Sequence, residues 1–309
     1  MMSLLLLRQI AAMFLMLGVG VLLVKLRVVE SSASRTVSII CINVITPCAI
    51  VRSFQLELTD AVLQNFLFVM AVALLLHVLL LALSWVMKKL GLDGVERASV
   101  LYSNCANLLF PIVTALLGNE WVIYSSGFFC VQTVFLWTHG QALISGSRKP
   151  EWKKLLTNPN FVAIIVGLLL MLLRIRLPGI IGTALDGFAS MLAPIAMLIV
   201  GMLLANADLK AIFSQRRVWL VAGLKLLLAP LLALALLKAV MCFAGALPDA
   251  KTLLYTSFLA MAAPTATLIT QLAQLHDRRA EYAGAINVMT TLLCIATMPL
   301  LTELFMRVL

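Results

Sequence analysis

Residues 98–118, ASVLYSNCANLLFPIVTALLG, and residues 250–275, AKTLLYTSFLAMAAPTATLITQLAQL, are two long apolar runs that each contain a central proline. These prolines are Pro111 and Pro264. A helix of about 20 apolar residues crosses the hydrocarbon core of a membrane. Proline removes a backbone hydrogen bond from a helix, and lipid offers no group to replace it. The sequence therefore predicts two membrane helices that are broken near the middle of the bilayer.

Eight further apolar runs, bounded by charged residues, accompany these two along the 309-residue chain. They cover approximately residues 4–26, 36–54, 61–87, 121–144, 159–175, 180–205, 217–245 and 282–306. Because 63% of the residues are hydrophobic and only 12% are charged, a soluble fold would have no place for this apolar surface. Runs of this length exclude the strands of a β-barrel. The sequence predicts an all-α polytopic membrane protein with ten transmembrane helices.

The Lys and Arg residues lie mainly in short loops between the apolar runs, and they set the predicted orientation. If the N-terminus lies outside, most of these residues fall in inward loops, as the positive-inside rule requires. Both termini are therefore predicted to face outside. The formal net charge is +10, but the basic residues are spread over the loops and form no single basic patch. We therefore expect no nucleic-acid partner.

The basic connector at residues 145–158 divides the ten predicted helices into two equal halves, residues 1–144 and 159–309. We expect this connector to be cytoplasmic. Five helices per half require the second half to enter the membrane with the opposite orientation, so the halves are predicted to be inverted repeats. Pro111 in the fourth run and Pro264 in the ninth then occupy matching positions.

Polar side chains surround both predicted breaks and form the candidate substrate site. They precede Pro111 and follow Pro264, and with the two prolines they make up the set Ser103, Asn104, Asn107, Pro111, Pro264, Thr265, Thr267 and Gln271. A helix that begins at a break presents free N–H groups and the positive end of its dipole, which favour an anionic solute. The alternative for each proline alone is a simple kink stabilised by neighbouring side chains. Two breaks in matching positions favour a binding site.

Two ionisable residues fall inside predicted spans, His77 in the third and Lys225 in the eighth. Ionisable groups within a membrane are costly, so both are candidates for ion coupling or for substrate contact. The alternative for Lys225 is an extended side chain that reaches the cytoplasmic interface. The alternative for His77 is a neutral, hydrogen-bonded packing residue. No Asp or Glu lies deep in a predicted span, which disfavours a sodium site built on carboxylates.

The sequence contains no pattern typical of a metal site, a cofactor site or an active site. The six cysteines lie in apolar segments without the spacing of metal ligands, and the three histidines form no ligand motif. No acid and base are paired with the spacing of a catalytic motif. We expect no bound metal, no cofactor and no enzymatic activity.

The segment from Asn104 to Pro111, together with Pro264-Thr-Ala-Thr, resembles the auxin efflux carrier family of the bile acid/sodium symporter superfamily. The resemblance covers essentially the whole chain. It implies a scaffold of spans 1, 2, 6 and 7 and a transport domain of spans 3–5 and 8–10. It also implies that the broken fourth and ninth helices cross at the substrate site. Asn104, Pro111 and Pro264 match the family's crossover residues.

The short connector is similar to that of bacterial family members, which include carriers described for malonate and malate. The broken helices and their polar residues predict a multi-pass transporter of a small organic anion that works by alternating access. The resemblance implies malonate or malate as the substrate and the bacterial inner membrane as the location. The expected partners are this anion, the lipid bilayer and, as the resemblance implies, a second copy of the chain in a homodimer. Two alternatives are a sodium-coupled organic anion symporter of the bile acid type and a membrane receptor or sensor that binds without transport.

Overall fold

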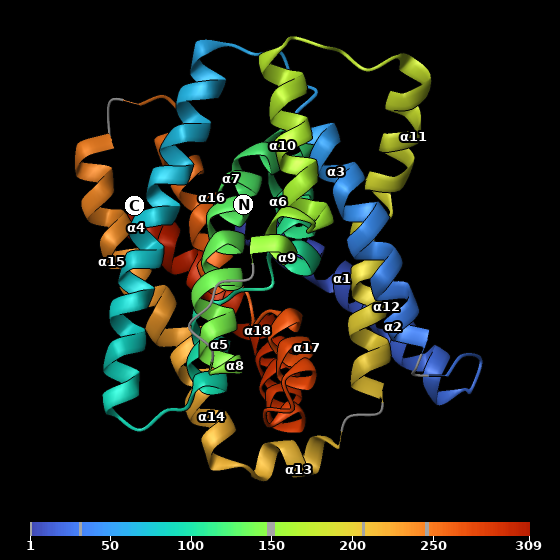
Figure 1. Ribbon diagram of the computed structural model, residues 1–309, viewed down its shortest axis with the longest axis vertical. Coiled ribbons are helices and arrows are strands. Elements are labelled where there is room, and N and C mark those ends of the chain that lie inside the picture. Colours follow the sequence, from blue (N-terminus) through green and yellow to red (C-terminus); the bar gives the residue numbers. More distant parts are fainter. Residues whose placement is uncertain (1, 31–32, 147–151, 206–207, 245–246) are drawn as a thin grey trace. The chain divides into compact units, whose positions relative to one another are not determined.

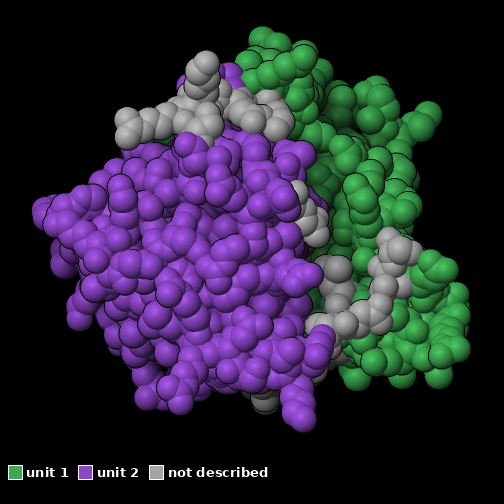
Figure 2. Space-filling view, turned by 60° about the horizontal axis from the view of Figure 1, so that its bottom comes forward, with its two compact units in different colours: residues 1–67, 106–126, 153–207 green, residues 68–105, 127–152, 208–309 purple. Residues whose placement is uncertain are grey.

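The computed structural model describes residues 2–30, 33–146, 152–205, 208–244 and 247–309. In this part of the chain the regular secondary structure is helical, with one isolated β-bridge (Figure 1). The contacts divide the chain into two compact units, which are coloured separately in Figure 2. Unit 1 comprises Met1–Leu67, Ala106–Ser126 and Lys153–Ala207, and unit 2 comprises Phe68–Cys105, Gly127–Trp152 and Asp208–Leu309.

Unit 1 consists mainly of helices from the first, second, sixth and seventh apolar runs. They are α1 (Met2–Lys25), α2 (Ala33–Ile40), η1 (Cys41–Ile45), α3 (Thr46–Ser53), α10 (Pro159–Leu172), α11 (Gly179–Ser190) and α12 (Leu192–Ala205), with α6 (Phe110–Leu117), η3 (Asn119–Trp121) and most of α9 (Trp152–Leu156). Helix α3 packs against α10 and α11. Helix α1 packs along α12, where a Cβ atom on Gly20 would lie 2.4 Å from the carbonyl oxygen of Leu198. Only glycine allows these two helices to approach so closely.

Unit 2 contains most of the third, fifth, eighth, ninth and tenth apolar runs. Its helices are most of α4 (Asp60–Lys89), α5 (Gly94–Leu101), most of α7 (Val122–Phe135), η4 (Leu136–Gly140), α8 (Gln141–Ser145), α13 (Leu209–Ser214), α14 (Arg216–Gly223), η5 (Leu224–Leu228), α15 (Ala229–Ala244), α16 (Ala250–Ala262), α17 (Thr267–Leu275) and α18 (Ala280–Val308). The long helix α18 packs against α14, α16 and α17. This arrangement buries the interrupted ninth run inside the unit.

The structure confirms a helical membrane protein, and it describes six helices that are long and apolar enough to cross a bilayer. Their bounds are Ala33–Ser53, Asp60–Lys89, Asn119–Ser145, Gly179–Met202, Arg216–Ala244 and Ala280–Val308. Among the other predicted runs, the fourth and ninth are interrupted helices, and the sixth forms the 14-residue helix α10. The first run lies in α1, Met2–Lys25, whose apolar stretch Leu15–Lys25 is shorter than a membrane span.

Three π-helical segments, η1, η2 (Cys105–Leu109) and η5, each end two residues before a proline. These prolines are Pro47, Pro111 and Pro230. A proline has no N–H for the carbonyl four residues earlier, and its ring clashes with that carbonyl in an α-helix. The wider π-helical turn changes the hydrogen-bond register before the proline, so the helix continues through it.

The sequence predicted that the helix of the fourth run is interrupted at Pro111. The structure shows that this prediction is wrong. The extended backbone lies earlier, at Tyr102–Asn104, between α5 and η2, and Pro111 is the second residue of α6. The prediction for the ninth run was correct, since the extended backbone at Ala263–Ala266 includes Pro264.

Candidate functional site

The two extended segments meet within unit 2 and form an antiparallel β-bridge between Ser103 and Thr265. The amide of Asn104 donates to the carbonyl oxygen of Pro264 at 2.8 Å, and the amide of Ala266 donates to the carbonyl oxygen of Tyr102 at 2.9 Å. Each interruption thus supplies hydrogen-bond partners for the other. We call residues 102–104 and 263–266 the crossing.

The side chain of Gln132 on α7 holds the first segment of the crossing. Its Oε1 accepts a hydrogen bond from the amide of Ser103 at 3.1 Å, and its Nε2 donates to the carbonyl oxygen of Ser103 at 2.9 Å. Gln132 and Ser103 are both buried. One side-chain amide therefore replaces two backbone hydrogen bonds that the interrupted helix has lost.

Residues of α18 and α5 hold the second segment at Thr265. Asn287 Nδ2 donates to the carbonyl oxygen of Thr265 at 2.9 Å, and Thr290 Oγ1 accepts from the amide of Thr265 at 3.3 Å. The hydroxyl of Thr265 donates to the carbonyl oxygen of Ser99 at 2.8 Å. Our sequence analysis did not identify Gln132, Asn287 or Thr290. The one available signal was the presence of an amide or hydroxyl side chain in an apolar run.

Lys225 reaches the crossing from the π-helical segment η5. Its side chain is fully buried, and its Nζ donates to the hydroxyl of Ser103 at 2.6 Å. The alternative in which Lys225 extends to the cytoplasmic interface is therefore wrong. The structure instead places a buried amine against one of the predicted substrate-binding residues.

His77 lies on α4 and is also buried, with 2% of its surface exposed. Its ring stacks on Phe135 with centroids 5.1 Å apart, and Nδ1 lies 2.7 Å from the carbonyl oxygen of Ala73. Because a carbonyl only accepts, Nδ1 carries the proton of the neutral ring, and Nε2 is an acceptor. Nε2 is buried and has no hydrogen-bond partner among the described residues.

Tyr102, in the first segment of the crossing, is anchored through its hydroxyl. The hydroxyl donates to the carbonyl oxygen of Phe135 at 3.0 Å and lies 3.0 Å from His139 Nδ1. Its ring packs so closely on Gly140 that a Cβ atom there would lie 2.7 Å from a ring carbon. The glycine in η4 therefore makes room for the aromatic ring that positions the crossing.

The remaining predicted site residues fall at different places around the two interruptions. Asn104 and Pro264 are buried, Thr267 is the first residue of α17, and Gln271 is exposed on the same helix. Pro111 is buried in α6, which belongs to unit 1. Asn107 lies in η2, and its side chain is outside the described part of the structure. The crossing itself brings together Ser103, Asn104, Pro264 and Thr265.

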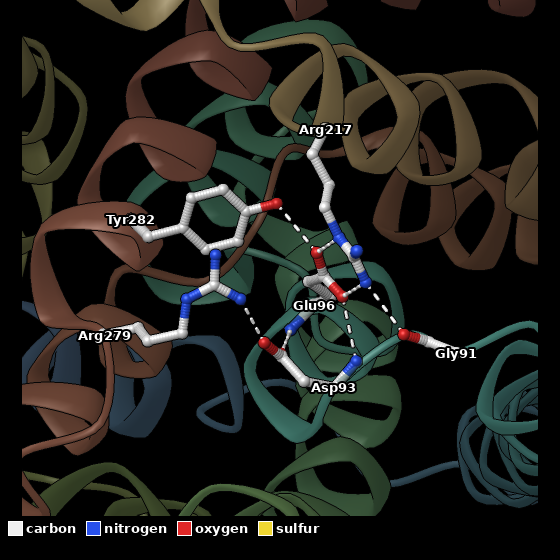
Figure 3. Close-up of polar contacts among 6 residues, drawn as sticks. All are labelled: Gly91, Asp93, Glu96, Arg217, Arg279 and Tyr282. Atoms are coloured by element: carbon white, nitrogen blue, oxygen red, sulfur yellow. Dashed lines mark hydrogen bonds and ion pairs between the residues drawn. The ribbon is translucent and has the colours of Figure 1, made fainter.

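A second polar cluster, which our sequence analysis missed, surrounds Glu96 at the start of α5 (Figure 3). The fully buried carboxylate accepts hydrogen bonds from Nε and from a terminal nitrogen of Arg217, the latter at 2.9 Å. It also accepts from the Tyr282 hydroxyl and the Asp93 amide, both at 2.8 Å. Asp93 in turn caps α5, by accepting from the Glu96 amide, and pairs with Arg279.

These partners determine the charge state of Glu96. Burial raises the pKa of its carboxyl, but the hydrogen bonds from Arg217, Asp93 and Tyr282 outweigh burial and lower the pKa below the ordinary value of 4.5. Glu96 is therefore ionised at neutral pH. The cluster joins the loop after α4 to the first turns of α5, α14 and α18.

Comparison with known proteins identifies the type of protein. A family model described as a membrane transport protein matches residues 5–151 and 147–302, which together cover nearly the whole chain. A search of curated proteins found no match. The family match agrees with the sequence prediction of a membrane transporter.

Proposed function

Because the chain belongs to the auxin efflux carrier family of membrane transport proteins, we propose that it is a secondary transporter of a small organic anion. As a family member it is a multi-pass membrane transporter and not an enzyme. The proposed substrate class is a mono- or dicarboxylate such as malonate or malate. The proposed location is the bacterial inner membrane, with a homodimer formed through the scaffold.

The crossing of residues 102–104 with residues 263–266 is the observation that carries this proposal. Polar side chains are buried there among apolar helices. Ser103 and Thr265 form the β-bridge, and the amide of Asn104 donates to the carbonyl oxygen of Pro264. Helix α17 begins immediately after the crossing, so its first N–H groups and its positive dipole end lie next to it. Lys225 adds a basic group. These features favour a negatively charged ligand over a neutral or cationic one.

We further propose ten spans in two inverted repeats, with both termini outside. Corresponding contacts in the two halves support this arrangement. Gln132 in the fifth run binds the backbone of Ser103 in the fourth, and Asn287 in the tenth run binds the backbone of Thr265 in the ninth. An inverted repeat predicts such a correspondence, because equivalent helices make equivalent contacts.

We propose alternating access through movement of a transport domain, spans 3–5 and 8–10, against a scaffold, spans 1, 2, 6 and 7. The division of contacts supports this assignment, since unit 1 contains most of the scaffold runs, and unit 2 contains the crossing with most of the other runs. A site held within one compact unit can move with that unit as a rigid body.

Uptake of labelled malonate and malate into proteoliposomes tests the proposal. We expect uptake by the wild-type protein and a loss of at least tenfold in Asn104→Ala, because Asn104 lies in the crossing. Asn119→Ala removes an exposed amide at the start of η3 and is the matched control, with wild-type uptake expected. If Asn104→Ala transports as fast as the control, the crossing is not the substrate site. If the wild-type protein binds a carboxylate but does not move it, the chain is a receptor and not a carrier.

A further inference from the structure

We propose that unit 1 contains a second binding site, separate from the crossing in unit 2, for a small organic anion with an apolar body and one carboxylate group. The site is a cavity of about 330 Å³ between residues 54–59, which follow α3, and residues 170–176, at the end of α10. Small-molecule sites in proteins are concave, mostly apolar and about 300–1,000 Å³ in volume. The inference goes beyond the proposed function and does not depend on transport.

The first observation is that the fold of unit 1 holds the two walls of the cavity together. The amide of Leu177 donates to Oε1 of Gln55 at 2.9 Å, and Arg176 pairs with Glu57 at 3.6 Å. Both contacts join the segment after α3 to the segment after α10. The cavity is therefore formed without a ligand, and a ligand does not have to order its walls.

The second observation is the apolar part of the lining. It includes Phe54 and Met171, which are buried, together with Leu170 and Ile175. Phe54 packs so closely on α10 that a Cβ atom on Gly167 would lie 2.6 Å from its ring. These side chains offer a rigid apolar surface to the body of a ligand.

The third observation is the charge of the lining. Arg174, Arg176 and Glu57 line the cavity, which gives an excess of one positive charge. Arg176 pairs with Glu57, whereas Arg174 has no ion-pair partner among the described residues. A guanidinium group binds a carboxylate through two parallel hydrogen bonds. The lining therefore favours a carboxylate over a neutral or cationic group.

The backbone of Arg174 provides a way to test this role. The amide of Ile175 donates to the carbonyl oxygen of Leu170 at 2.8 Å, and the amide of Arg174 donates to that of Met171 at 3.1 Å. These bonds form a Schellman motif, in which the residue after the C-cap adopts the left-handed conformation that favours glycine. Arg174 occupies this position with a φ of 55°.

Helix α1 ends in the same way, with Arg27 at a φ of 57°. The amides of Arg27 and Val28 donate to the carbonyl oxygens of Val24 and Leu23, both at 3.0 Å. Arg27 is exposed and does not line the cavity. The two arginines therefore have the same role at a helix end, and only Arg174 has the proposed role in binding.

The test uses benzoate as the probe, with purified full-length protein and the substitution Arg174→Gly. Benzoate should raise the melting temperature of the wild-type protein, because a ligand that binds the folded state stabilises it. Calorimetric titration should show a loss of about tenfold or more in affinity for the variant, which lacks the hydrogen bonds between charged groups. Without benzoate, the variant should unfold about 2 °C or more above wild type, because glycine relieves the left-handed strain.

Arg27→Gly is the matched control, and it should show the same rise in melting temperature with wild-type affinity for benzoate. Asn104→Ala, in the crossing, should also bind benzoate with wild-type affinity. Benzamide lacks the charge and acetate lacks the apolar body, so each should bind about tenfold or more weakly than benzoate. Leu58→Trp serves as a second variant if Arg174→Gly does not fold, since Leu58 lines the cavity and the larger side chain should fill it and abolish binding.

Wild-type affinity in Arg174→Gly, or equal losses of affinity in Arg174→Gly and Arg27→Gly, would overturn the inference. Loss of benzoate binding in Asn104→Ala alone would also overturn it, because the anion would then bind at the crossing. Stabilisation by phosphatidylglycerol and not by benzoate would assign the cavity to a lipid headgroup and reject the free anion. Failure of malonate and malate uptake would refute the proposed function without affecting these binding results.

Discussion

The substitution Glu96→Gln should lower the stability of the protein markedly, because it removes the only buried carboxylate among the described residues. The carboxylate accepts four hydrogen bonds, two of them from Arg217. Glutamine is neutral and has one acceptor oxygen, so about two of these bonds are lost. A hydrogen bond to a charged group contributes about 1.5–3 kcal/mol.

The exposure of Arg217 reduces this loss. The Arg217 side chain is 52% exposed, so water can solvate its guanidinium when Glu96 no longer pairs with it. The net decrease in the free energy of unfolding should therefore be about 2–3 kcal/mol. A domain of 150–250 residues loses roughly 2–4 °C in melting temperature per kcal/mol. We expect a decrease of about 4–12 °C in thermal unfolding followed in detergent.

Glu303→Gln is the matched control, since Glu303 pairs with Arg307 on an exposed face of α18. Such a pair contributes less than about 0.5 kcal/mol, so the melting temperature should change by less than about 2 °C. Equal decreases in the two variants would show that burial of Glu96 does not stabilise the fold and would refute the reasoning.

The pH dependence gives an independent check of the same contact. Because the pKa of Glu96 is lower in the folded protein, the stability that Glu96 contributes is complete well above pH 4.5 and is lost as the pH falls through the lowered pKa. The difference in melting temperature between wild type and Glu96→Gln should therefore be largest at neutral pH and shrink below pH 4.5. A difference that stays constant down to pH 3.5 would contradict the assigned ionisation.

Two further predictions concern helix packing and the crossing. Gly20→Ala should destabilise the protein by about 1–3 kcal/mol, because the new Cβ atom would meet the backbone of α12. Gly18→Ala is the control, since a Cβ atom there has open space and should be neutral or stabilising. Thermal unfolding of both variants measures the difference in stability. Gln132→Leu should cost about 2–5 kcal/mol, because it leaves the amide and carbonyl of Ser103 buried without their partner. Gln64→Leu, at an exposed position of α4, is its control, and equal melting temperatures for this pair would exclude the role given to Gln132.

The apolar runs predicted the helices well, because segment length and hydrophobicity are local properties of the sequence. The third run was predicted at 61–87 and forms α4, Asp60–Lys89, and the tenth was predicted at 282–306 and forms α18, Ala280–Val308. The interruption of the ninth run was also predicted correctly at Pro264. The fourth was misplaced because the π-helical turn η2 accommodates Pro111, and a proline pattern alone does not reveal such a turn.

Contacts between distant parts of the chain were beyond prediction from one sequence. Glu96 was overlooked because it lies just outside an apolar run, and its burial depends on Arg217 and Tyr282 far along the chain. Gln132 and Asn287 were overlooked for a similar reason, since a single amide in a membrane helix does not show which backbone it binds. For Lys225 the sequence left two alternatives, and only the observed contact with Ser103 separates them.

The crossing also shows how the fold meets the requirements of a membrane protein. In a membrane, each backbone group released by an interrupted helix needs a partner from the protein. Gln132, Asn287 and Thr290 meet much of this need, so these polar side chains are already engaged with the backbone. Lys225 differs because its partner at the crossing is the side-chain hydroxyl of Ser103 and not a backbone group. The side chains that bind the backbone of the two segments are thus different from the amine of Lys225, so a substitution at Lys225 leaves these backbone contacts in place.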